Sequence, residues 1–282
     1  MGVKTIIDLK QVRANQRRAA KQATEGADFL FRAVADDVAL RLSPVTRTFE
    51  RGILLVPEAA PDLAESPLAA LDRFRMSEDG ANEALGLEAA CYDLAISLLT
   101  LHESNDTPGI LAQIRRALKP DGLFLACVPG GDTLAELRES LLSAEVELTG
   151  AANARVLPFI DVRDAGSLLQ RAGFALPVAD AETLTVRYDT MFHLMRDLRA
   201  MGATNTLFSR SRRFASPALF QKAAEHYALN HADPDGRIRA TFTSVWMSGW
   251  APHDSQQKPL RPGSAANRLA DFLGNKSEGS DR

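Results

Sequence analysis

Residues 91–141 read CYDLAISLLTLHESNDTPGILAQIRRALKPDGLFLACVPGGDTLAELRESL, and this stretch decides the fold. Two apolar runs, 92–99 and 123–128, flank a segment at 108–118 whose apolar residues recur at helical spacing. Strands that are apolar throughout are typical of parallel sheets covered on both faces. The stretch therefore predicts a strand, helix and strand unit of an α/β fold, with a right-handed crossover.

The same rules place the remaining elements. Apolar residues at helical spacing predict helices, and short apolar or β-branched runs predict strands. The expected helices are 28–42, 161–172, 191–201, 217–229 and 267–273, and the expected strands are 52–56, 182–188 and 240–250. After the strand at 123–128, Thr133 and Glu136 have the spacing of a capping box that starts a further helix, and Asp132 could cap that helix equally well.

Composition limits the classes of function. The chain has 282 residues, 45% of them hydrophobic, and a net charge of -3, which gives no reason to expect nucleic acid as a partner. No apolar run approaches the length of a transmembrane segment. Cys91 and Cys127 sit in apolar runs, so we expect neither a disulfide nor a metal site. This cysteine usage fits a reducing, intracellular compartment.

Three segments are expected along the chain. Residues 1–27 are basic, and Asp8 together with the scarcity of serine favours a solvated helix over a transit peptide. Residues 28–255 form one domain, because no Gly/Ser-rich or Pro-rich linker divides them. Residues 256–282 form a polar tail.

A family resemblance follows from the quoted residues. The stretch 91–141 resembles the fourth strand, helix and fifth strand of class I S-adenosylmethionine-dependent methyltransferases, and LKPDGLF at 118–124 is its most typical piece. LPFIDVRDAGSLLQRAGF at 157–174 and WMSGWAPHDSQQKPLRPGSA at 246–265 are similar to bacterial relatives of the mitochondrial complex I assembly factor with a methyltransferase fold. The malonyl-carrier-protein methyltransferase of biotin synthesis is a more distant match.

This resemblance implies a Rossmann-like, mostly parallel sheet of seven strands with an antiparallel last strand. It implies a helical insert at about 190–237 that covers the substrate side. It also implies S-adenosylmethionine as cofactor and a protein substrate or assembly partner.

The first half of the chain departs from the family pattern. A cofactor at the carboxyl edge of such a sheet needs a glycine-rich loop after the first strand, where the backbone approaches it closely. Here the loop holds Pro57, Glu58, Ala59 and Ala60. Only 39 positions separate Ile53 from Tyr92, too few for the usual three strand and helix units. The cofactor-side half is therefore shortened and its cofactor binding is in doubt.

Candidate cofactor residues follow from these strand ends. They are Val56, Glu58, Asp72, Ser97 and Leu98. We expect Asp72 at the end of a short strand over 68–72, as a partner for the cofactor's ribose or else as a surface carboxylate.

Other candidates belong to the substrate side. His102 follows the strand at 92–99, and its ordinary pKa suits it to act as a base, although a structural role is the alternative. Gly130, Gly131 and Asp132 form either a substrate loop or a tight turn. Trp250 and His253 are expected on the last strand, at the far edge of the sheet, and in the loop after it, as a partner surface.

Three functions remain open. The first is a methyltransferase-like assembly or modification factor with a degenerate cofactor loop. The second is an active S-adenosylmethionine-dependent methyltransferase on an unknown acceptor. The third is a non-catalytic binding partner of an intact paralogue.

Overall fold

The computed structural model describes residues 5–63, 66–74 and 83–257. The chain divides into two compact units, residues 1–252 and residues 253–282. The expected helix at 267–273 lies outside the described residues.

The first unit is built on a sheet of six described strands in the order β2-β1-β3-β4-β6-β5. The strands are β1 (Gly52–Leu55), β2 (Asp72–Phe74), β3 (Tyr92–Leu98), β4 (Leu118–Pro129), β5 (Ala175–Tyr188) and β6 (Ile238–Trp250). Neighbours among β2, β1, β3 and β4 are parallel, and β6 is antiparallel to both β4 and β5. This confirms the Rossmann-like α/β fold with an antiparallel last strand.

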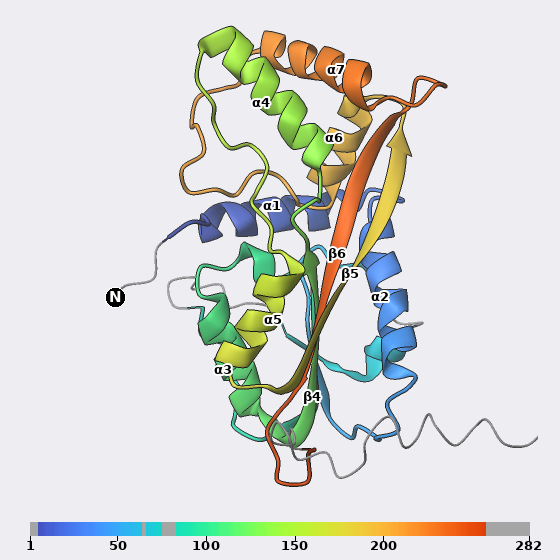
Figure 1. Cartoon of the computed structure of the whole chain (residues 1–282), viewed down its shortest axis with the longest axis vertical. Coiled ribbons are helices and arrows are strands. Elements are labelled where there is room, and N and C mark those ends of the chain that lie inside the picture. The colour runs from blue at the N-terminus through green and yellow to red at the C-terminus, as the bar shows by residue number, and fades with distance from the viewer. Residues whose placement is uncertain (1–4, 64–65, 75–82, 258–282) are drawn as a thin grey trace, which may run out of the picture. The chain divides into compact units, whose positions relative to one another are not determined.

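Helices cover both faces of the sheet (Figure 1). Helix α2 (Phe29–Leu42) buries Phe31, Val34, Ala35 and Val38 against one face, because these residues recur on one side of the helix. Helices α3 (Thr107–Ala117) and α5 (Val162–Arg171) cover the other face. This burial on both faces explains why β3 is apolar along nearly its whole length.

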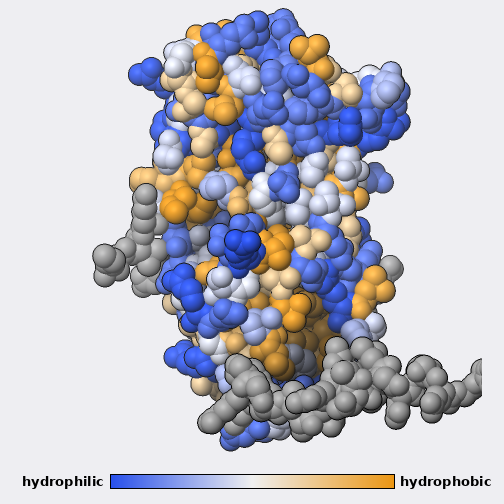
Figure 2. Space-filling model, viewed as in Figure 1, coloured by the Kyte–Doolittle hydropathy of each residue, from blue (hydrophilic) through white to orange (hydrophobic). Residues whose placement is uncertain are grey.

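A third hydrophobic cluster lies at the far ends of β5 and β6. It joins α4 (Ala135–Thr149), α6 (Met191–Ala200) and α7 (Pro217–His231). The buried Tyr227 donates a hydrogen bond from its hydroxyl to the carbonyl of Arg239, 2.7 Å away. The predicted helical insert before the last strand is therefore confirmed. Hydrophilic residues dominate its visible outer surface, with hydrophobic residues scattered among them (Figure 2).

The first half is shortened, as expected. The described residues between β1 and β3 hold only the 3-10 helix η1 (Pro67–Ala70) and β2. The sheet has six strands within the described chain, and the expectation of seven is not met there. The missing unit is consistent with the short interval between Ile53 and Tyr92.

The last strand does not lie at the edge of the sheet. β6 is hydrogen-bonded between β4 and β5, so the expected edge position of Trp250 is wrong. The order of strands along the chain does not reveal this, because β5 and β6 are joined by the helical insert. Trp246 on the same strand is buried, with the guanidinium of Arg41 4.3 Å from its ring centroid.

Helix α1 (Leu9–Gln22) is not the solvated helix that its basic composition suggests. It buries Asn15, Gln16 and Ala19, and it packs against α6. The Asn15 side chain donates a hydrogen bond to the carbonyl of Thr204, 3.1 Å away. Polar side chains therefore join this helix to the rest of the first unit.

The expected capping box is also wrong. Helix α4 begins at Ala135, and Leu134 before it has no side-chain cap. The Thr133 hydroxyl donates to the carbonyl of Thr243 and accepts from its amide, both at 3.0 Å, while Glu136 accepts from the amide of Thr241. Both side chains bind β6 in place of their own helix.

Candidate functional site

A large cavity opens at the carboxyl ends of β1, β3 and β4. The chain runs from β1 to β2 on one side and then crosses to β3 on the other, so the sheet has its topological switch point here. The cavity measures about 890 Å³ and is lined by residues 57–61 after β1, by Leu99, His102 and Glu103 after β3, and by Pro129 of β4. Residues of α1, α2 and their connecting loop form its outer wall.

The loop after β1 leaves this cavity open although it has no glycine. The amide of Ala60 donates a hydrogen bond to the carbonyl of Pro57, 3.1 Å away, which closes a tight turn. Ala59 and Ala60 have only methyl side chains, so the wall stays shallow. Small-molecule sites in proteins measure roughly 300–1,000 Å³. In volume and in the size of its wall residues, the cavity therefore fits a cofactor as large as S-adenosylmethionine.

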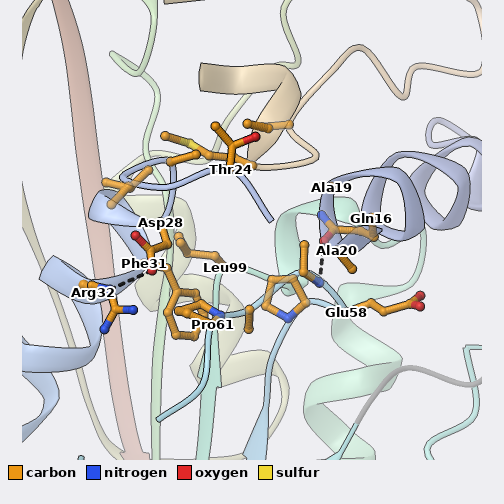
Figure 3. Close-up of a pocket in the computed structure, with 18 of the residues that line it drawn as sticks. Gln16, Ala19, Ala20, Thr24, Asp28, Phe31, Arg32, Glu58, Pro61 and Leu99 are labelled. Atoms are coloured by element: carbon orange, nitrogen blue, oxygen red, sulfur yellow. Dashed lines mark hydrogen bonds and ion pairs between the residues drawn. The ribbon is translucent and has the colours of Figure 1, made fainter. Parts of the chain in front are cut away.

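Charged pairs stand on opposite sides of the cavity (Figure 3). Asp28 accepts a hydrogen bond from Arg32 at 2.6 Å. Glu58 is ion-paired with Arg17 of α1 at 3.8 Å. Pro61 and Leu99 lie between these two sides in the view. The cavity thus has an apolar middle with carboxylates around it.

Glu103 is the carboxyl on the inner wall, at the end of the 3-10 helix η2 (Leu101–Glu103). Burial raises the pKa of Glu103 to about 7, and a hydrogen bond from the Gln16 side chain opposes this shift. Near neutral pH the group therefore exchanges its proton readily. It is a candidate both for binding a cation and for moving a proton.

His102 stands beside Glu103 on the same turn. Burial lowers the pKa of His102 to about 4, so its imidazole is neutral at pH 7. Its Nδ1 is buried with no hydrogen-bond partner among the described residues. The ring centroid lies 6.1 Å from that of Phe159. The role of His102 as a base stays a prediction, and the low pKa makes it a weak base.

A second chamber of about 330 Å³ adjoins the first. The two share six wall residues, Leu30, Leu99, His102, Pro129, Met201 and Ala203. The second chamber is walled mainly by apolar residues of α4, α6, α7 and β6. His102 therefore stands at the junction between a cofactor-sized cavity and an apolar chamber under the helical insert.

Arg155 is a charged group on the wall of the second chamber. It makes two hydrogen bonds to the carboxylate of Glu145, at 2.8 and 3.1 Å. Glu145 is only 5% exposed, and its bonds to Arg155 and Asn153 lower its pKa. The pair fixes the loop between α4 and α5.

Asp72 is not where the ribose partner was expected. Residues 67–70 form η1, so no strand spans 68–72, and Asp72 opens β2 in register with Ile53. It lies at the amino end of the strand, where it is ion-paired with Arg51 at 3.3 Å. Asp72 is not among the described lining residues of either cavity.

The other cofactor candidates divide into two groups. Glu58 lines the large cavity, whereas Val56, Ser97 and Leu98 are buried behind it and are not among its described lining residues. The Ser97 hydroxyl is 2.7 Å from that of Thr100. Their role in cofactor binding stays a prediction.

The substrate-side candidates within the first unit do not come together. Gly130 packs against β6 so closely that a Cβ would lie 2.7 Å from Val245, and Asp132 is exposed. Trp250 pairs with Leu123 at the amino end of β4, the opposite edge of the sheet from the cavity. His253 belongs to the second unit, where its Nδ1 is 2.7 Å from the Ser255 hydroxyl. Their proposed roles are not tested by this arrangement.

The candidate residues named from the sequence leave out two residues of the site. Gln16 lies in the basic segment that was expected to be solvated, and nothing in its pattern marks it as buried. The position of Glu103 does predict a carboxylate at the mouth of the pocket, because Glu103 follows a strand that ends at the carboxyl edge of the sheet. No helix in the described part of the chain is long and apolar enough to cross a membrane.

Comparisons with known proteins agree with this geometry. A family model for a methyltransferase domain matches residues 15–177. Arginine-hydroxylase NDUFAF5 of Dictyostelium discoideum is 43% identical over 195 residues, which cover 69% of this chain and 44% of that protein. Its counterpart in Homo sapiens is 40% identical over 183 residues, covering 65% of this chain and 53% of that one.

Two further likenesses are more distant. Malonyl-[acyl-carrier protein] O-methyltransferase of Nitrosospira multiformis is 38% identical over 173 residues, covering 61% of this chain and 54% of that protein. The crystal structure of a putative methyltransferase from Bacillus halodurans has a TM-score of 0.48 and 12% identity, covering 77% of this chain and 99% of that one. The matched region spans about half the length of the sequence relatives.

The family model covers more than half of the chain, and the cavity lies at the switch point where such folds bind ligands. This chain therefore belongs to the methyltransferase domain family.

Proposed function

We propose that the chain is a methyltransferase-fold assembly factor that hydroxylates an arginine side chain of a partner protein. Arginine hydroxylation is the activity in the names of the relatives that are 40–43% identical to it. The structural observation that carries the proposal is the half-buried carboxyl of Glu103 on the wall of a cavity large enough for both a cofactor and a side chain.

Glu103 suits a guanidinium ligand. A planar guanidinium matches a carboxylate through two parallel hydrogen bonds. Its positive charge would lower the raised pKa of Glu103, so that the carboxyl ionises when the arginine binds. The neutral His102 beside it adds no opposing charge. The apolar middle of the cavity, with Leu99 and Pro61, would contact the methylene groups of the arginine.

S-adenosylmethionine is the cofactor we assign to the part of the cavity between α1 and the loop after β1. Glu58 and Thr24, which both line the cavity, would hold its polar groups. When bound, it supplies an activated methyl group. The methyl side chains of Ala59 and Ala60 would lie against it where the family pattern has glycine.

Hydroxylation needs dioxygen and a reductant, which amino-acid side chains do not supply. It replaces a C–H hydrogen of the arginine with a hydroxyl group. One oxygen atom of dioxygen enters the product, and the other leaves as water after taking up two electrons from a reductant and two protons. We propose that both co-reactants come from the surroundings, while the chain binds the arginine, orients it and shields it from water.

Methyl transfer is the second candidate. The family match and the open cavity favour it, because an activated methyl donor needs mainly correct positioning against its acceptor. The third candidate, binding without chemistry, uses the same surface around the cavity. For each of them we propose a location in the bacterial cytoplasm, with the mitochondrial matrix as the alternative.

One experiment separates the three. Total protein from a strain that lacks this chain is incubated in air with the purified protein and S-adenosylmethionine, and arginine-containing peptides are compared by mass spectrometry. An arginine that gains one oxygen atom supports the proposal. A gain of one methylene group replaces it with methyl transfer. If no peptide changes in mass, both reactions are contradicted, and binding without a reaction is the remaining candidate.

A further inference from the structure

The N-terminal segment with α1 and the chain after α6 form one continuous surface. The Asn15 side chain donates a hydrogen bond to the carbonyl of Thr204, and further along Ile7 pairs with Leu207 in an antiparallel bridge. The two segments therefore lie side by side and run in opposite directions. In the view of Figure 1, α1 lies across the molecule between the helical insert and α5.

These two segments concentrate positive charge. Residues 5–22 contain five Lys or Arg residues and residues 199–213 contain four, whereas Asp8 is the only acidic residue in either range. The whole chain, in contrast, has 36 acidic residues and 33 Lys or Arg residues. We call the outer face of these two ranges the basic surface. Its exposed cations are Lys10, Arg17, Lys21, Arg199, Arg212 and Arg213.

The acidic residue of these ranges is already paired. The Asp8 carboxylate lies 2.9 Å from the guanidinium of Arg210 and 3.2 Å from that of Arg212, so its single charge is shared between two cations. Lys10 and Arg213 make no ion pair within the described part of the chain. Their charges are therefore available to a partner.

The cations near the other end of α1 also receive little compensation. Arg18 donates a hydrogen bond to the neutral hydroxyl of Thr204, 3.3 Å away. Burial, together with the positive charge of Arg199, lowers the pKa of Arg18. Arg17 lies 3.8 Å from the carboxylate of Glu58, and both side chains are partly exposed, so water screens this pair. A surface with such an excess of one sign attracts an oppositely charged partner.

Apolar side chains stand beside these cations. Ile7 and Leu207 are buried, so the alternation of side chains along the two paired segments turns Ile6 and Phe208 outward, where they are 48% and 55% exposed. The amide of Phe208 donates to the carbonyl of Ile6 at 2.7 Å, which keeps the two residues together. Phe214, just beyond the basic surface, is fully exposed. Exposed aromatic residues next to arginines are typical of protein–protein interfaces.

The basic surface borders the large cavity. Gln16 and Ala20 of α1 line this cavity, and so do Met201 and Ala203 of the chain after α6. In the proposed function the arginine of a partner protein enters there. Because that arginine is positive, the basic surface repels it unless negative groups accompany it. Acidic residues on both sides of the arginine would turn this repulsion into attraction.

We propose that the basic surface binds an acidic segment of the partner protein, so that the arginine admitted to the cavity is one flanked by Asp and Glu residues. This inference rests on the proposed function and names the class of its substrate. Charge complementarity between two surfaces speeds their association and discriminates against other partners, and salt weakens it.

Peptide binding to the whole protein tests the proposal. The probe is a fluorescent peptide with a central arginine between two runs of glutamate, and fluorescence anisotropy measures its affinity. A second peptide has glutamine in place of every glutamate. We expect the glutamate peptide to bind at least about tenfold more tightly, with an advantage that shrinks as salt is raised. Equal affinities of the two peptides would overturn the proposal.

A charge reversal locates the binding surface. Lys10→Glu with Arg213→Glu reverses two exposed charges, and we expect it to weaken binding of the glutamate peptide about tenfold. The same variant should bind more tightly than wild type to a peptide with lysine in place of every glutamate. This gain requires a folded protein, so it guards against loss of folding as the cause of the weaker binding.

The matched control makes the same change in net charge elsewhere. Arg116→Glu with Arg171→Glu alters the ends of α3 and α5, which precede the amino ends of β4 and β5 and lie at the opposite edge of the sheet from the cavity. We expect it to keep the affinity for the glutamate peptide within about twofold of wild type. Equal weakening in the two double variants would overturn the assignment to the basic surface.

Mass spectrometry separates this inference from the proposed function. Hydroxylated arginines without acidic neighbours would overturn the inference and leave hydroxylation standing. A preference for the glutamate peptide that depends on the basic surface, with no arginine hydroxylated, would contradict the proposed function while the acidic partner stands. Binding to phosphatidylglycerol vesicles without any preference between the peptides would assign the basic surface to a membrane and overturn the inference.

Discussion

Glu103 and His102 are neighbours in η2, and burial shifts their pKa values in opposite directions, to about 7 and to about 4. Between these two values neither group is charged. Above pH 7 the pair carries one negative charge and no positive one. The turn after β3 therefore carries a carboxyl group that loses its proton when a cation binds beside it. This response is the electrostatic basis of the proposed arginine site.

Replacing Glu103 by Gln should stabilise the protein at alkaline pH. The folded pKa of Glu103 is raised above its ordinary 4.5, so the unfolded state holds fewer protons at this site between about pH 4.5 and 7, and wild type loses stability as pH rises through this window. Glu103→Gln removes that loss, and its advantage over wild type should grow by about 2 kcal/mol between pH 5 and pH 8. Urea unfolding at both pH values measures it. Glu225→Gln on the surface of α7 is the control, and an advantage of Glu103→Gln that does not change with pH would contradict the raised pKa of Glu103.

His102 should destabilise the protein in acid. Its folded pKa is lowered from 6.5 to about 4, so the unfolded state binds the proton first, and stability is lost as pH falls from about 6.5 toward 4. His102→Gln removes this loss, which unfolding at pH 7 and pH 5 would detect. If the stability of His102→Gln changes between pH 7 and pH 5 as much as that of wild type, the imidazole of His102 is accessible to water.

The same variant tests the proposed base. Because a group with a pKa near 4 accepts protons weakly at pH 7, we expect His102→Gln to keep arginine modification within about threefold of wild type. Turnover is measured at several pH values. A loss of about a hundredfold at neutral pH would restore His102 as a catalytic base.

Cofactor binding should depend on the loop after β1 and not on Asp72. S-adenosylmethionine at a hundredfold excess over its Kd stabilises the native state by about 2.7 kcal/mol, which raises the melting temperature. Ala60→Trp fills the cavity and should abolish this rise. Asp72→Asn, at the other end of the sheet, should keep it. Loss of the rise in Asp72→Asn would mean that the carboxylate reaches the cofactor after all.

The ion pair between Arg155 and Glu145, beside the second chamber, should stabilise the folded protein. Arg155→Leu leaves the buried Glu145 carboxylate without its partner, and we expect a loss of about 3 kcal/mol in the free energy of unfolding. The double variant Arg155→Leu with Glu145→Leu removes both charges and should recover most of it. Chemical denaturation of the three proteins gives these values. Equal losses in the single and double variants would show that packing, and not charge, carries the effect.

The fold was predictable because the sheet is covered on both faces. Continuous apolar runs mark β1, β3 and β4, and helical periodicity marks α2 and α3. The conformation of the short segment before β2 was not predictable, because the apolar run at 68–71 is as compatible with a 3-10 turn as with a strand. Asp72 was therefore assigned to the wrong end of its strand.

The site was harder to predict than the fold, because it depends on contacts between distant residues. Gln16 and Glu103 line the same cavity although 87 positions separate them in the chain, and neither has a local sequence pattern that predicts this. Thr133 and Glu136 show the converse error. Their spacing is that of a capping box, but both side chains form hydrogen bonds to β6 and not to the start of their own helix.

The central claim is that Glu103 holds a partner's arginine while it is hydroxylated. The most direct measurement incubates protein from a strain lacking this chain with wild type or with Glu103→Gln under isotopically heavy dioxygen, and reads arginine peptides by mass spectrometry. The account predicts one heavy oxygen atom on an arginine with wild type and at least a tenfold lower yield with Glu103→Gln. Equal yields from both proteins, or heavy oxygen on no arginine, would contradict it.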